Sequence, residues 1–160
     1  MKSTFTKDDL KRLPKRHDTL VGIDSDGCVF DTMSVKQKVH FHPLIIRFWG
    51  LEPCEKAFRA CAEFVNLYSK TRGSNRFPAL LRTFELFADY PGVKASGVPL
   101  PKVDALRAYI GSGLPLGNPS LKAEAERTGD PELTRLLHWS LAINAEISAN
   151  MRPVPPYEWA

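Results

Sequence analysis

Most of the chain shows apolar residues at helical spacing. From Ala57 to Tyr68, for example, the apolar positions fall on one helical face made by Ala57, Phe58, Cys61, Phe64, Val65 and Tyr68. Capping residues, prolines and glycines mark where the helices begin and end. We expect a short capped helix near Thr6 and then longer ones over about 34–40, 43–49, 53–68, 80–87, 103–110 and 131–149.

A single stretch has the pattern of a buried strand. It runs from about Thr19 to Asp24, within "DTLVGIDSDG". A lone strand has no hydrogen-bonding partner and is not viable as a fold. Either its partners are hidden in weak patterns, or the sheet belongs to sequence not present here. We favour the interpretation that the rest of the sheet belongs to sequence not present here. The chain itself is expected to be predominantly α.

Composition narrows the class of protein. With 160 residues, 43% of them hydrophobic and 25% charged, the chain is predicted to form a soluble globular protein without a membrane span. A net charge of +4 is too small and scattered to favour nucleic acid as a partner. Three cysteines without paired spacing and a charged amino-terminal stretch favour a cytoplasmic location.

The expected strand ends in an acidic motif, "GIDSDGCVFDT". Asp24 and Asp26 would repel each other unless a positive group stabilises them, so their proximity suggests a bound cation, a shared proton or a catalytic role. The end of a strand in an open α/β sheet is a common place for a ligand, and Gly27 allows a sharp turn there. Asp31 is better placed to cap the following helix than to react.

The stretch "LVGIDSDGCVFDT" resembles the first motif of the haloacid dehalogenase-like (HAD) hydrolases, an apolar strand followed by Asp-x-Asp-Gly-x-x-x-Asp. The resemblance implies a Rossmann-type α/β core, here residues 1–33, then a helical cap over 34–150 and a return linker over 151–160. It further implies a Mg²⁺-dependent phosphatase that acts on a small phosphorylated metabolite through an aspartyl-phosphate intermediate. Asp24 would be the nucleophile and a metal ligand. Asp26 would be the general acid and base, with its backbone carbonyl as the second metal ligand.

The other catalytic elements of that family are not evident in the sequence. Ser112, Lys122 and the pair Gly129-Asp130 lie in helical patterns and are better interpreted as helix ends or solvated surface. We therefore expect the amino-terminal part of such an enzyme. The alternatives are one subunit of a split enzyme, completed by a second polypeptide, or a noncatalytic helical binding module.

Two further groups could bind a ligand. The loop "SKTRGSNR" carries Lys70, Arg72 and Arg76, which with Gly27 are the candidate substrate-binding residues. An ordinary solvated loop is an equally good interpretation. His40 and His42 form His-x-His, which could bind a metal, although a position at a helix end is the better interpretation.

Overall fold

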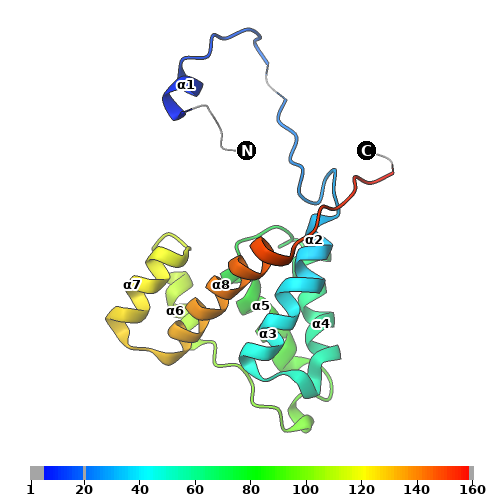
Figure 1. Cartoon of the computed structure of the whole chain (residues 1–160). Coiled ribbons are helices and arrows are strands. Elements are labelled where there is room, and N and C mark those ends of the chain that lie inside the picture. Colours follow the sequence, from blue (N-terminus) through cyan, green and yellow to red (C-terminus); the bar gives the residue numbers. More distant parts are fainter. Residues whose placement is uncertain (1–5, 20, 159–160) are drawn as a thin grey trace.

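The computed structural model describes residues 6–19 and 21–158, and helices make up most of it (Figure 1). The predominantly α character expected of the chain is confirmed. The α-helices are α1 (Lys7–Lys11), α2 (Thr32–Val35), α3 (His42–Trp49), α4 (Glu55–Glu63), α5 (Arg76–Asp89), α6 (Asp104–Gly111), α7 (Asn118–Thr128) and α8 (Pro131–Asn150). Two π-helical segments, Lys36–Phe41 and Phe64–Tyr68, and two 3₁₀ turns, Glu52–Cys54 and Lys94–Ser96, complete the set.

Residues 32–150 form a helical domain around one aromatic-rich core. Phe58 and Phe87 are fully buried and meet edge to face, with ring centroids 5.9 Å apart. Trp139 of α8 packs in the same manner against Trp49, also at 5.9 Å. Such contacts between α3, α4, α5 and α8 bury large apolar surfaces and hold the domain together.

The first helical segment of this domain begins at the expected cap but continues differently from the prediction. Asp31 is the amino-terminal cap, as expected, because its carboxylate accepts a hydrogen bond from the amide of Ser34. The helix then continues into α3 through the π-helical segment Lys36–Phe41, without the expected break before Pro43. Pro43 has no N–H to donate, and the wider turn just before it, closed by a bond from His42 to Gln37, accommodates that loss.

The helix formed by α4 and its π-helical extension also departs from the expected pattern. Phe58, Cys61 and Val65 are buried as predicted. Phe64 and Tyr68 are 53% and 70% exposed, so their assignment to the apolar face was wrong. The π-helical turn that begins at Phe64 rotates the following side chains away from the 3.6-residue period on which the prediction rested.

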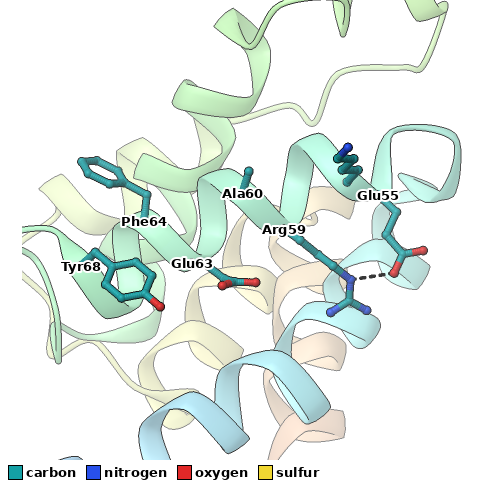
Figure 2. A pocket seen from close by; sticks show the side chains of 7 residues that line it. Glu55, Arg59, Ala60, Glu63, Phe64 and Tyr68 are labelled. Carbon is teal, nitrogen blue, oxygen red and sulfur yellow. Dashed lines mark hydrogen bonds and ion pairs between the residues drawn. The ribbon is translucent and has the colours of Figure 1, made fainter.

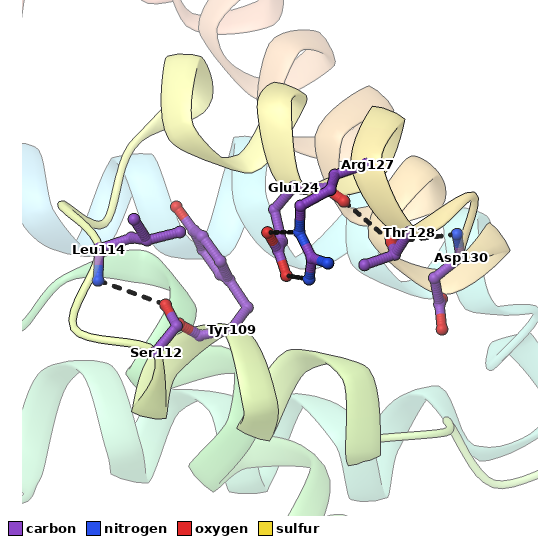
Figure 3. Close-up of polar contacts among 7 residues, drawn as sticks. All are labelled: Tyr109, Ser112, Leu114, Glu124, Arg127, Thr128 and Asp130. Atoms are coloured by element: carbon purple, nitrogen blue, oxygen red, sulfur yellow. Dashed lines mark hydrogen bonds and ion pairs between the residues drawn. The ribbon is translucent and has the colours of Figure 1, made fainter.

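Helices α6, α7 and α8 are joined by short polar turns (Figure 3). Ser112 ends α6 by donating its hydroxyl to the carbonyl of Tyr109 and accepting the amide of Leu114. Asp130 caps α8 by accepting the amide of Glu132 at 2.7 Å. Both residues therefore lie at helix ends, as expected. Lys122 lies on the surface of α7, as expected, in an ion pair with Glu126.

The segment expected to be a strand forms none in the part of the chain that the structure describes. Leu20 lies outside the described residues, and residues 21–25 have no regular secondary structure. Val21 and Ile23 are 77% and 78% exposed. Their positions, two residues apart, would place both side chains on one face of a strand. The expected Rossmann-type core is thus not shown, and this apolar segment has no sheet to join within the described residues.

The carboxyl-terminal tail returns to the acidic motif. The amide of Tyr157 donates to the carbonyl of Val29 at 2.9 Å, and Pro156 pairs with Phe30 in an isolated antiparallel bridge. In Figure 1 the tail leaves α8 and runs beside the segment that leads into α2. The helical domain therefore begins and ends at the same place. Among the described helices, none is long and apolar enough to span a membrane.

Candidate functional site

The acidic motif folds into a tight loop. The amide of Asp26 donates to Oδ1 of Asp24 at 3.3 Å, and the carbonyl of Ser25 accepts the amides of Val29 and Phe30. Gly27 closes the loop by donating its amide to the carbonyl of Phe30 at 2.8 Å. Its φ of +73° lies in the left-handed region, which explains the need for glycine at this turn. Both aspartates are exposed, so a ligand can reach them.

A lysine and a threonine hold Asp26. Lys36, from the π-helical segment, forms an ion pair with one carboxylate oxygen, and the hydroxyl of Thr32 donates to the other at 2.8 Å. The hydrogen bond from Lys36, followed by that from Thr32, lowers the pKa of Asp26. A general acid needs a raised pKa, so this arrangement favours the charged, proton-accepting form of Asp26.

The basic loop reaches the acidic loop through Arg72. Its Nη2 donates to the carbonyl of Gly27 at 3.0 Å. A Cβ added at Gly27 would lie 2.8 Å from Cγ of Met33 and 3.0 Å from that same arginine nitrogen. The structure thus brings two predicted substrate-binding residues, Gly27 and Arg72, together. Arg72 braces the loop by this contact, and Lys70 lies exposed without a hydrogen bond or ion pair among the described residues.

Arg76, the third basic residue, is oriented into the helical domain. Its Nη1 donates to both the carbonyl and the hydroxyl of Ser140, at 3.1 Å each. The guanidinium lies over the ring of Phe41, 5.4 Å from its centroid. Burial lowers the pKa of Arg76. Its surroundings differ from those of Arg72, although the two arginines are only four positions apart in the sequence.

The histidine pair lies inside a helix and not at its end. Nδ1 of His40 is 3.2 Å from Oε1 of Glu146, and the fully buried His42 packs edge to face against Phe58. Neither ring nitrogen of His42 has a hydrogen-bond partner in the described structure. Desolvation, followed by the nearby charge of Arg59, lowers the pKa of His42 to about 4. We therefore assign His42 to the core as a neutral side chain.

The described residues contain no group of three or more histidines, cysteines, aspartates or glutamates that could hold a metal. Asp24 offers a carboxylate and Asp26 a backbone carbonyl, but the carboxylate of Asp26 is engaged by Lys36. Two oxygen ligands do not form a Mg²⁺ site on their own, because the ion takes near-octahedral coordination. The expected Mg²⁺ site is thus not formed by these residues.

An open hollow also lies on the outer face of α4 (Figure 2). Most of its charged lining is paired, because Nε of Arg59 donates to Oε1 of Glu55 at 2.7 Å and Glu63 pairs with Lys38. Phe64 and Tyr68 supply exposed aromatic surface beside it. No residue of the acidic motif lines this hollow, so it adds nothing to the site at Asp24.

Sequence analysis missed the most direct partners of Asp26. Thr32 and Lys36 lie six and ten residues after it, on the first turns of the helix that follows the motif. A search of that following helix for residues able to face the motif would have found both. Comparison of the chain with models of protein families, with curated proteins and with solved structures found no match. The interpretation of the site therefore depends on its own geometry.

Proposed function

We propose that this chain carries the nucleophile loop and helical cap of a HAD-like phosphatase. The observation that carries the proposal is the position of the acidic loop. It lies where the helical domain begins and where the tail returns, with Tyr157 bonded to Val29. A domain inserted directly after a core strand has this arrangement. The exposed side chains of Val21 and Ile23 supply the apolar strand that such a core would bury.

In this proposal Asp24 attacks the phosphorus of a phosphate monoester. An oxygen–phosphorus bond forms to Asp24, the bond to the alcohol oxygen breaks, and Asp26 gives that oxygen a proton. Asp26, ionised again, then removes a proton from the water that attacks the aspartyl-phosphate. Inorganic phosphate leaves, and Asp24 is regenerated as a carboxylate.

Lys36 supports both steps. With no substrate bound, its ammonium holds Asp26 as a carboxylate. An incoming phosphate would compete for that ammonium, and its negative charge would raise the pKa of Asp26 by repulsion. Asp26 could then take up the proton that the first step requires. The lowered pKa of Asp26 thus describes the enzyme before substrate binds, when Asp26 is a carboxylate paired with Lys36.

The remaining part of the core must come from other sequence, either a continuation of the same chain or a second polypeptide. That part would supply strands to pair with residues 19–24 and the further ligands that Mg²⁺ requires. A noncatalytic helical binding module is the alternative that the test must separate from this proposal.

The proposal can be tested with the chain produced together with the sequence that completes its sheet. Asp24→Asn should abolish hydrolysis of phosphate monoesters. Asp26→Asn should lose ~10²–10⁴-fold with an alkyl phosphate, and lose less in the first step with p-nitrophenyl phosphate, whose leaving group needs little protonation. Rapid-quench kinetics separates the two steps. Near wild-type turnover by Asp24→Asn would disprove the assignment of the nucleophile.

A further inference from the structure

A cavity of about 340 Å³ lies inside the helical domain, next to the acidic loop. Lys36, which pairs with Asp26, and Met33, which lies against Gly27, both line it. The volume is at the lower end of the range for small-molecule sites. Both π-helical segments contribute to its wall, through Gln37 in the first and Asn66 in the second. Such wide turns are frequent at functional sites.

Polar side chains on this wall lack partners. The ring of Trp139, a residue 1% exposed, forms part of the wall, but its indole N–H is covered by protein and does not open into the cavity. The side-chain amide of Gln37, a residue 9% exposed, forms no hydrogen bond with the described residues. Asn66 donates its amide to the carbonyl of Ala62, which leaves its side-chain oxygen as an acceptor. Most buried polar groups are hydrogen-bonded, and leaving one unpaired is costly, so the side-chain amides of Gln37 and Asn66 indicate an occupant with polar atoms.

The charge on the wall is positive and is not balanced. Arg76 lines the cavity, and both of its hydrogen bonds leave from Nη1 to neutral acceptors on Ser140. Within residues 6–19 and 21–158, no carboxylate pairs with Arg76, and no aspartate or glutamate lines the cavity. A half-buried guanidinium ordinarily has an anionic partner, and a carboxylate matches its planar donors.

We propose that this cavity binds the carboxylate-bearing part of a small molecule, with Arg76 as the charge partner and with Gln37 as a donor. The choice of substrate rests on the proposed phosphatase function. On that basis the substrate is the phosphate monoester of a short hydroxy acid. Its phosphate lies at Asp24, beside Lys36, and its carboxylate extends into the cavity. Arg76, and not Arg72, then selects the second anionic group.

Binding can be tested on the chain itself, without phosphoryl transfer. Glycolate, 3-hydroxypropanoate and 4-hydroxybutanoate are titrated into ¹⁵N-labelled protein, and the corresponding neutral amides serve as controls. The readout is the indole N–H resonance of Trp139, assigned with Trp139→Phe. We expect at least one acid to shift this resonance saturably, while its amide does not. A cavity that holds only water would give no shift with any acid and would overturn the proposal, as would equal binding of the amides.

Variants identify the charge partner. Arg76→Gln should weaken binding of the acid roughly 10- to 100-fold. Lys102→Gln removes an exposed positive charge that does not line the cavity and should leave binding unchanged. If Arg76→Gln fails to fold, Gln37→Leu takes its place and should also weaken binding. Equal affinity in the parent and in the folded cavity variant would refute the assignment.

A second arm separates this proposal from the phosphatase proposal. In the completed protein, phosphate esters of these hydroxy acids are compared with alkyl phosphates of equal length and with bisphosphates. Lower KM for the carboxylated esters, lost in Arg76→Gln, supports both proposals. Carboxylate binding without any hydrolysis refutes the phosphatase and leaves the cavity assignment standing. Hydrolysis without this preference, or with preference for bisphosphates, refutes the cavity assignment alone.

Discussion

His42 should make the helical domain unstable in mild acid. The side chain is 0% exposed, and its pKa is lowered from 6.5 to about 4 because burial penalises the charged form. In the unfolded chain the ring takes up a proton as pH falls below 6.5, while in the folded chain it stays neutral until about pH 4. The stabilising contribution is therefore complete above pH 6.5, falls between pH 6.5 and 4, and falls no further below pH 4.

The size of this effect follows from the same two values. The difference between 6.5 and about 4 corresponds to about 3 kcal/mol of unfolding free energy in total. About 2 kcal/mol of it should already be lost at about pH 5. Urea denaturation followed by circular dichroism, repeated between about pH 8 and pH 4, measures this loss directly.

A variant isolates the contribution of His42. His42→Leu keeps an apolar side chain of similar size beside Phe58 and cannot titrate. Its free energy of unfolding should therefore fall by about 2 kcal/mol less than that of the parent between about pH 8 and pH 5. His138→Phe, at an exposed position of α8, controls for removing a histidine. Parallel losses in the parent and in His42→Leu would show that burial of a neutral His42 is not the cause.

Three further predictions concern the acidic loop. Gly27→Ala should lower the free energy of unfolding by roughly 1–3 kcal/mol, because the new Cβ would meet Met33 and the backbone φ is +73°. Gly113→Ala, where φ is +75° but the space is open, should lower it less. Equal urea midpoints for the two variants would contradict this. Arg72→Gln should speed amide exchange at Gly27 and Phe30 while Lys70→Gln does not, because of these two side chains only Arg72 contacts the loop; equal rates would show that Arg72 does not brace it. The 160-residue chain alone should hydrolyse p-nitrophenyl phosphate negligibly, and calorimetry should show weak binding of Mg²⁺, because too few ligands for the ion are present among the described residues. Clear turnover that Asp24→Asn abolishes would mean that the site is complete.

Local signals in the sequence were sufficient for much of the helical domain. Asp130 followed by Pro131 predicted the start of α8, and Gly50 predicted the end of α3, because a cap or a positive φ depends on the nearest residues. Phe64 and Tyr68 were misassigned because the π-helical turn changes the period, and nothing in the local pattern of apolar residues marks that turn. The strand was predicted from the pattern over 19–24, but a strand also requires a partner.

In the candidate site, too, local sequence predicted some features and tertiary packing determined the others. The motif itself made Asp24, Asp26 and Gly27 candidates, and the loop composition made Arg72 and Arg76 candidates. The separate environments of the two arginines could not be predicted, because they depend on Gly27 in one case and on Ser140 and Phe41 in the other. Contacts across 45 and 64 residues of sequence are set by the packing of the helices, not by spacing along the chain.

Transfer of a phosphoryl group to Asp24 can be measured directly. The direct measurement is to incubate the completed protein with acetyl phosphate, quench it in acid, reduce it with borohydride, and locate the modified residue by peptide mass spectrometry. We predict that position 24 is converted from aspartate to homoserine and that Asp24→Asn gives none. Asp26→Asn should give more homoserine, because hydrolysis of its aspartyl-phosphate is slowed. Hydrolysis of phosphate monoesters with no modification at Asp24, or with modification at another residue, would contradict the assignment of Asp24 as the nucleophile.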